Sequence, residues 1–282
     1  MTGRSGESGR AGPARTRGTL PRARKRFGQH FLEPTWVAKL IDSLAPKPGD
    51  VFLEIGPGRG ALTKPLAPRV ARLIAVEIDR DLAAHLKAAM PPHVRIVEAD
   101  FLLVDLKSVL QDERPPFRVV GNLPYNVSSP ILFKLLHDAG EGAFLSDATL
   151  MLQKEVADRL LASPGTAEYG ALAIQVALLA TVTRVLTLPP GAFRPPPKVT
   201  SAVVRLDFHP AAEDVGDRRV FERVVRGVFL QRRKTLVNAL KPVADSFGRS
   251  AREVLENAGV DGGKRPEALT VAEMARLARA VL

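Results

Sequence analysis

The stretch Val51-Phe52-Leu53-Glu54-Ile55-Gly56-Pro57-Gly58-Arg59-Gly60 decides the fold. Its first half is a short, mostly apolar run, which is too short for a helix and predicts a buried strand. Its second half alternates glycine with other residues, so the strand runs into a loop whose backbone a ligand can approach closely. The loop lacks the Gly-Lys-Ser/Thr ending of a P-loop, and its G-x-G-x-G spacing departs from the dinucleotide pattern G-x-G-x-x-G.

The same unit recurs downstream. Short apolar runs lie at residues 73–76, 94–97 and 117–120, and helix-compatible segments lie at 61–66, 81–89 and 101–110. Strands that alternate with helices predict βαβ units around a parallel sheet, so the fold class is α/β. Further strands are expected at 148–152, 182–188 and 199–208, and the last two follow each other closely enough to form an antiparallel pair.

Each of the first four strands ends in residues suited to a binding site. The four ends begin at Gly56, Glu77, Asp100 and Asn122, at intervals of 21, 23 and 22 residues. In a parallel sheet these ends share one edge, where open α/β sheets bind their ligands. Turn glycines and helix-capping acids would explain one such end, but four in register favour a single cleft.

The first three ends suit an adenosine-containing ligand. The glycine loop, including Gly56 and Gly58, offers close backbone approach, and Glu77 is placed to bind ribose hydroxyls. Asp100 offers an acceptor for an adenine amino group, with Phe101 beside it as an apolar wall. Because no pyrophosphate-binding pattern is present, S-adenosylmethionine is the expected cofactor.

The fourth end, Asn122-Leu123-Pro124-Tyr125, suits methyl transfer to a base nitrogen. The residue before Pro124 favours an extended backbone, which turns carbonyls toward the cleft. An amide oxygen and a carbonyl that accept the two amine protons would localise the nitrogen lone pair, and Tyr125 would stack on the base. This chemistry depends on proximity and orientation, and it needs neither a metal nor a covalent nucleophile.

Composition narrows the class of protein. The 282 residues are 45% hydrophobic, contain no cysteine and carry a formal net charge of +11. No apolar run is long enough for a membrane span, so no membrane partner and a cytoplasmic location are expected. A basic chain indicates a nucleic-acid partner, although a generally basic proteome gives the same balance.

The positive charge is unevenly distributed. Residues 1–26 hold eight basic residues against Glu7, so the remaining 256 residues supply only +4. Residues 1–23 are predicted to be a disordered basic tail rather than an organellar transit peptide. A second basic cluster, in 221–245, contains Arg232, Arg233 and Lys234 among apolar residues at helical spacing. It predicts an amphipathic helix whose basic face is either solvated or in contact with phosphates.

The four strand ends resemble those of class I S-adenosylmethionine-dependent N6-adenine methyltransferases. Residues 24–32, Arg-Lys-Arg-Phe-Gly-Gln-His-Phe-Leu, resemble the N-terminal motif of the ribosomal RNA adenine dimethylases. Residues 151–159, 193–204 and 229–240 are similar to the KsgA branch of that family, and the resemblance covers about residue 22 to the C-terminus. It implies a Rossmann-like methyltransferase domain over 24–209 and a helical RNA-binding domain over 210–282.

The resemblance implies dimethylation of N6 of two adjacent adenosines near the 3′ end of 16S ribosomal RNA in the immature small subunit, as a step of ribosome biogenesis, by a monomer. It assigns the cofactor contacts to His30, Leu32, Gly56, Gly58, Glu77, Asp100 and Asn122. It assigns the target-base site to Asn122, Leu123, Pro124, Tyr125 and Phe193, and RNA contacts to Arg24, Lys25, Arg26, Arg232, Arg233 and Lys234.

Several alternatives remain open at this point. Many relatives have Asn where this chain has His30, and either side chain forms hydrogen bonds. Phe193, beside three prolines, is otherwise a core residue, and residues 153–159 present either a solvated helix face or an RNA-contacting edge. A large-subunit dimethylase of the macrolide-resistance type and an assembly factor with non-essential catalysis are the competing functions. The glycine spacing disfavours a nicotinamide dehydrogenase.

Overall fold

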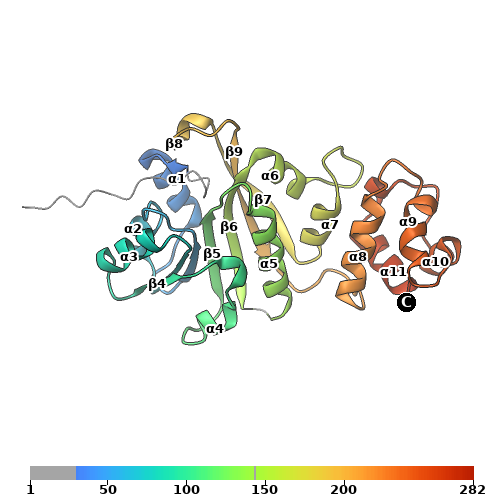
Figure 1. The fold of residues 1–282 in the computed structure, drawn as a ribbon, viewed down its shortest axis with the longest axis horizontal. Coiled ribbons are helices and arrows are strands. Elements are labelled where there is room, and N and C mark those ends of the chain that lie inside the picture. The colour runs from blue at the N-terminus through green and yellow to red at the C-terminus, as the bar shows by residue number, and fades with distance from the viewer. Residues whose placement is uncertain (1–29, 143) are drawn as a thin grey trace, which may run out of the picture.

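The computed structural model describes residues 30–142 and 144–282 (Figure 1). The tail of residues 1–23 and the cluster Arg24, Lys25 and Arg26 lie outside these ranges. The described chain forms a Rossmann-like α/β fold followed by helices. None of its helices is both long and apolar enough to cross a membrane.

A mixed seven-stranded sheet forms the centre, in the order β4-β3-β2-β5-β6-β9-β7. The first five strands in that order are parallel, whereas β9 pairs antiparallel with both β6 and β7. The predicted parallel sheet and its antiparallel last pair are therefore confirmed. The strands are β2 (Val51–Ile55), β3 (Arg72–Glu77), β4 (Val94–Glu98), β5 (Phe117–Asn122), β6 (Leu145–Gln153), β7 (Ala180–Leu188) and β9 (Ser201–Phe208).

Helices cover both faces of the sheet, because neighbouring residues of a strand point to opposite sides. Phe52 packs in one hydrophobic cluster with Leu40 of α1, and Leu53 packs in the other with Leu132 of α5. Both strand residues are fully buried, as expected for a sheet covered on both faces. The helices are α1 (Pro34–Leu44), α2 (Thr63–Leu66), η2 (Ala67–Arg69), α3 (Arg80–Ala89), α5 (Ser128–Gly140), α6 (Lys154–Leu161) and α7 (Ala171–Ala177).

The single helix predicted over 101–110 is wrong. The segment splits into the 3₁₀ helix η3 (Phe101–Leu103) and α4 (Leu106–Leu110). Two aspartates cause the break, because each caps the turn that follows it. Asp100 accepts a hydrogen bond from Leu102 N at 2.9 Å, and Asp105 accepts one from Lys107 N at 3.1 Å. Such caps compete with a continuous helix.

The single helix predicted over 221–245 is also wrong. The chain forms α8 (Arg218–Phe229) and α9 (Leu236–Asp245), and the basic run 232–234 lies in the turn between them. The start of α9 is held by a distant loop, because Leu236 N and Val237 N donate to Lys264 O at 2.8 Å and Gly262 O at 3.1 Å. A tertiary contact therefore ends a helix that local periodicity would continue.

The C-terminal helices gather at one end of the molecule, as Figure 1 shows. They are α8, α9, α10 (Ala251–Ala258), η5 (Pro266–Ala268) and α11 (Val271–Ala280). Their buried residues share one continuous hydrophobic cluster with the sheet. The chain between β9 and α8, residues 209–217, contains neither helix nor strand, and the domain boundary at 209/210 remains our proposal.

A small second sheet fixes the start of the described chain. β1 (Phe31–Leu32) pairs antiparallel with β8 (Phe193–Arg194), which follows η4 (Pro190–Ala192). Arg194 Nε donates to Glu33 Oε1 at 2.8 Å, and Glu33 N donates to Ala192 O at 2.9 Å. We call residues 30–33 the strap, because these contacts hold them against a segment about 160 residues later in the chain.

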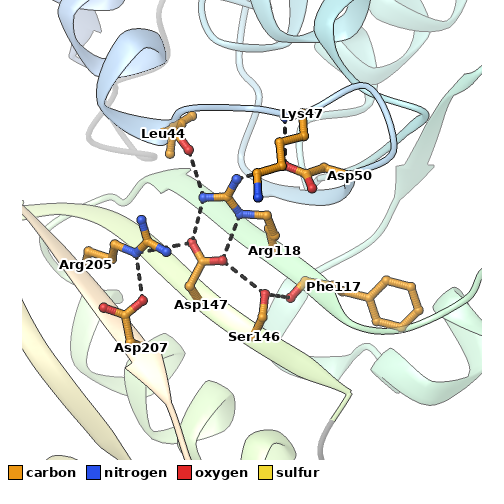
Figure 2. A network of polar contacts seen from close by, with 9 residues as sticks. All are labelled: Leu44, Lys47, Asp50, Phe117, Arg118, Ser146, Asp147, Arg205 and Asp207. Atoms are coloured by element: carbon orange, nitrogen blue, oxygen red, sulfur yellow. Dashed lines mark hydrogen bonds and ion pairs between the residues drawn. The ribbon is translucent and has the colours of Figure 1, made fainter.

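A polar network closes the opposite, amino-terminal edge of the parallel strands (Figure 2). Arg118 donates to Asp147 Oδ1, Asp50 Oδ2 and Leu44 O, each at 2.8 Å. Asp147 is 2% exposed and also lies 3.7 Å from Arg205 Nε. One guanidinium thus joins α1, the start of β2, β5 and β6.

Candidate active site

The carboxyl ends of the parallel strands enclose a cavity. The four predicted strand ends converge there, since Gly56, Glu77, Asp100 and Asn122 all line it. The strap closes one side with His30 and Leu32, and Gly58 belongs to the same wall. The remaining turn residues Leu123, Pro124 and Tyr125 also line the cavity, whereas Phe193 does not.

The glycine loop adopts a backbone that other residues avoid. The φ angles of Gly56, Gly58 and Gly60 are +65°, +58° and +79°, in the left-handed region. Gly58 also lies against the strap, because a Cβ atom there would be 3.5 Å from the ring of Phe31. The loop therefore needs glycine for its conformation, and it brings backbone amides to the cavity wall.

Glu77 links this loop to the end of β3. The residue is 3% exposed, and its Oε2 accepts from Gly58 N at 2.8 Å while Oε1 accepts from Asp79 N at 2.9 Å. Burial raises the pKa of Glu77, and the two backbone amides oppose that rise. The carboxyl group is thus rigidly held, and its oxygens keep further lone pairs for a ligand.

Glu54 is a cavity residue that the sequence reasoning passed over. It is 1% exposed, and its Oε2 atom makes no hydrogen bond within residues 30–142 and 144–282. Burial raises the pKa of Glu54 to about 8, with smaller effects from Thr63, which lowers it, and Glu77, which raises it. The available signal was an acidic residue inside an otherwise apolar strand, two positions before the first glycine.

The side of the cavity around Asp100 is mostly apolar. Asp100 caps η3 with its Oδ1 atom, and Phe101 beside it is 5% exposed and lines the cavity. Ile78 also lines the cavity but is 50% exposed, so it offers an open apolar surface. These residues form a slot for a flat ring with one carboxylate acceptor at its edge.

The strap and the fourth strand end meet at Asn122. Asn122 Nδ2 donates to the carbonyl oxygen of His30 at 3.0 Å. The His30 ring stacks on Tyr125 with 5.9 Å between ring centroids, and its Nδ1 lies 2.8 Å from Pro195 O. The Nδ2 bond fixes which way the Asn122 carboxamide points, so its oxygen is left for a ligand.

Tyr125 is anchored at the hydroxyl end of its ring. Its hydroxyl lies 2.6 Å from Ser201 Oγ at the start of β9, and Ser201 is fully buried. Burial raises the pKa of Tyr125, and the Ser201 hydrogen bond opposes the rise. The hydroxyl contact therefore anchors the side chain at the cavity rim.

Phe193, which the resemblance assigns to the target-base site, does not line the cavity beside Tyr125. Phe193 is 2% exposed and packs in the hydrophobic cluster beneath the strap, where it is the register partner of Leu32. The pairing of β8 with β1 turns this ring into the core. In this structure Phe193 is thus a core residue, as the alternative interpretation had it.

The candidate RNA-contacting residues lie apart from the cavity. Arg233 and Lys234 are exposed in the turn between α8 and α9, and Arg232 Nη2 donates to Ala167 O at 3.1 Å. On α6, Lys154 pairs with Asp158 and Arg159 with Glu155. Because these α6 charges compensate each other, the structure favours the solvated-face interpretation of that helix.

Comparison with known proteins gives a consistent family. The profile of the family described as "Ribosomal RNA adenine dimethylase" matches residues 21–281. A protein of Acinetobacter baylyi, "Ribosomal RNA small subunit methyltransferase A", is 47% identical over 260 residues, 91% of each chain. A protein of the same name from Geobacter metallireducens is 45% identical over 274 residues, 94% of this chain and 98% of its own.

Two solved structures share the fold over most of their length. A dimethyladenosine transferase from Plasmodium falciparum superposes with a TM-score of 0.74 at 28% identity, covering 88% of this chain and 96% of its own. The 23S rRNA methyltransferase ErmE superposes with a TM-score of 0.61 at 28% identity, covering 89% of this chain and 99% of its own.

Proposed function

The chain belongs to the ribosomal RNA adenine dimethylase family, and we propose that it dimethylates N6 of two adjacent adenosines near the 3′ end of 16S ribosomal RNA, using S-adenosylmethionine. The observation that carries the proposal is the convergence of Glu77, Asp100 and the turn 122–125 on one cavity. The small-subunit names of relatives at 43–47% identity favour this substrate over large-subunit RNA.

The cavity residues fit S-adenosylmethionine. The Oε2 atom of Glu54 is a buried polar group without a partner among the described residues, which a ligand amine or hydroxyl would satisfy. Gly56, Gly58, His30 and Leu32 would contact the methionine side, Glu77 the ribose and Asp100 the adenine. When bound, the cofactor supplies a methyl group on a positively charged sulfur.

Asn122 and Leu123 would prepare the target amine. The His30 carbonyl holds Nδ2 of Asn122, which leaves Oδ1 to accept one amine proton. Among residues 30–142 and 144–282 the Leu123 carbonyl accepts no hydrogen bond, whereas the Pro124 carbonyl is occupied by Val127 N at 3.1 Å. Leu123 is therefore the second acceptor. Two acceptors that hold the amine protons would localise the nitrogen lone pair and aim it at the methyl group.

Tyr125 would receive the flipped adenine on its ring face. An adenine stacked in RNA cannot present N6 to the cofactor, so the base must leave its stack, at a cost of a few kcal/mol. The Ser201 hydrogen bond anchors the Tyr125 side chain before the base arrives, so less ordering is left for the binding step. The His30 ring lies on Tyr125 in this structure, and it must slide aside for the base.

Other parts of the molecule complete the proposal. We assign RNA backbone contacts to Arg232, Arg233 and Lys234, and to the basic cluster 24–26 outside the described residues. The helical unit from 210 to 282 would hold RNA beside the catalytic domain, and a monomer in the cytoplasm would act on immature small subunits. An assembly role can coexist with this activity.

Transfer of labelled methyl groups to isolated ribosomal particles tests the function. The protein is expected to label 16S RNA in immature small subunits, with two dimethylated adenosines seen by mass spectrometry. Label in large-subunit RNA alone would establish the macrolide-resistance type instead. Binding of NAD without binding of S-adenosylmethionine in calorimetry would overturn the proposal as a whole.

Asn122→Ala tests the mechanism. The variant loses one of the two proton acceptors, and we expect a fall in kcat of roughly 100-fold or more. RNA affinity, measured by fluorescence anisotropy, should stay nearly unchanged, because the base still stacks on Tyr125. An equal loss of RNA affinity would instead give Asn122 a structural role.

A further inference from the structure

A second groove lies on the α5 side of the molecule and has no part in the proposed methyl transfer. It is formed by η3, α5, α7 and α8, so it lies where α8, the first of the C-terminal helices, meets α5 and α7. Arg218 Nη2 of α8 fixes this junction by donating to Leu136 O of α5 at 3.0 Å. Leu102 lines both this groove and the cofactor cavity, so a single 3₁₀ turn separates the two.

The groove contains a buried polar group without a partner. Gln175 of α7 lines it and is 6% exposed, and its Nε2 atom makes no hydrogen bond within the described parts of the chain. Buried amide groups in folded proteins are almost always satisfied. Because the Gln175 side chain lines the groove, we take a ligand oxygen bound there as the missing acceptor.

The groove also presents one uncompensated cation on an aromatic ring. Lys134 pairs with Asp138, and Arg218 pairs with Glu222. Arg226 is exposed, has no carboxylate within ion-pair distance among residues 30–142 and 144–282, and lies 5.5 Å from the ring centroid of Phe133. A guanidinium next to an aromatic face suits a phosphate attached to a flat ring.

We propose that this groove binds one nucleotide of the RNA substrate, outside the methylation site. Arg226 would hold the phosphate, the apolar wall of Leu102, Pro130 and Phe133 would contact the base, and Gln175 Nε2 would donate to a base oxygen. Single-stranded RNA is recognised through such stacking and edge contacts. The proposal rests on the proposed function, because RNA is the expected partner.

Two single variants, Arg226→Ala and Gln175→Leu, test the groove, and Arg223→Ala is the matched control. Arg223 lies on the same helix and also stacks on a phenylalanine, with 4.6 Å to the ring centroid of Phe247, but it does not line the groove. Binding of a 3′-terminal 16S RNA fragment and of immature small subunits is measured at several salt concentrations.

Arg226→Ala should weaken binding about tenfold and reduce the slope of log affinity against log salt by about one. Gln175→Leu should weaken binding several-fold and leave that slope unchanged, because it removes no charge. Arg223→Ala should match the wild type in both. Affinity for S-adenosylmethionine, from calorimetry, should be the same in all proteins, which also shows that they are folded.

Equal effects of Arg226→Ala and Arg223→Ala, or wild-type binding by Gln175→Leu, would overturn the groove assignment. A loss seen on particles but not on the RNA fragment would assign the groove to a protein partner and overturn it as well. Methyl transfer by the wild type is measured alongside. Its absence would refute the proposed function, whereas normal transfer with unaffected variants refutes the groove alone.

Discussion

At the scale of single residues, the site depends on carboxyl and amide groups whose state is set by burial. Glu77, Asn122 and Tyr125 each have uncharged partners, respectively two backbone amides, a backbone carbonyl and a buried hydroxyl. Such partners hold a side chain in place without an ion pair. A further acidic group of the cavity, Glu54, has no such partner on Oε2 within the described residues, and burial raises its pKa to about 8.

The raised pKa of Glu54 makes a prediction about stability. The folded-state pKa is about 8 and the ordinary value is 4.5, so between these pH values the folded protein holds a proton that the unfolded chain has released. The free energy of unfolding therefore falls as the pH rises from 4.5 to about 8, by up to about 1.4 kcal/mol per pH unit. Glu54→Gln keeps the neutral shape and removes the titration.

The measurement is the free energy of unfolding by urea for both proteins at pH values from 5 to 8. The wild type should lose more stability with rising pH than Glu54→Gln does. Parallel curves would show that Glu54 is ionised in the folded protein, or that water reaches it.

At the scale of elements, the turn between α8 and α9 changes how the basic run 232–234 must be understood. In a continuous helix these side chains would point to different sides, whereas a turn gathers them at one end of two packed helices. Arg233 and Lys234 are exposed there, next to Leu230, which is 86% exposed. The turn thus places three basic residues close together on the surface.

Charge reversal of Arg232, Arg233 and Lys234 to Glu should weaken RNA binding and flatten its salt dependence. Binding releases fewer counterions when phosphate contacts are lost. The magnitude of the slope of log affinity against log salt should therefore fall by up to about three. The control reverses Lys39, Lys47 and Lys87, which are exposed on or near α1 and α3. An unchanged slope in the first variant, or the same change in both, would refute the role of the turn.

At the scale of the whole molecule, the two ends of the parallel strands have different roles. The carboxyl edge forms the cavity, and the amino edge is closed by the Arg118 network of Figure 2. In that network Arg118 is 12% exposed and the Asp147 carboxylate 3%, so the pair is shielded from water. The network ties together elements that come from residues 44 to 207, and it stabilises the sheet from which the cavity is built.

Arg118→Ala should destabilise the protein by about 3–5 kcal/mol, because it leaves the Asp147 carboxylate buried without its main partner. The control is Arg69→Ala, which breaks an ion pair with Asp42 whose side chains are 49% and 72% exposed. An exposed pair is worth at most about 1 kcal/mol. Urea unfolding measures both values, and equal losses would mean that the network is no stronger than a surface pair.

Much of the fold was predictable from short-range patterns. Strand β2 and the glycine loop follow from an apolar run and its turn residues, and the convergence of Glu77, Asp100 and Asn122 follows from the regular spacing of parallel strands. The two broken helices were missed for different reasons. Asp100 and Asp105 are local caps that the sequence already contained, whereas the start of α9 is held by contacts from the loop near Gly262.

The sequence by itself determined the sheet, the edge on which the site lies and the chemical types that meet there, because strand period and turn chemistry act between near neighbours. Only the tertiary structure decided that the His30 carbonyl orients Asn122, 92 residues away, and that Ser201 holds Tyr125, 76 residues away. It also decided that Phe193 is core and that Glu54 is buried. Burial and side-chain partners depend on contacts between segments that are far apart in the sequence. Local sequence patterns do not specify those contacts.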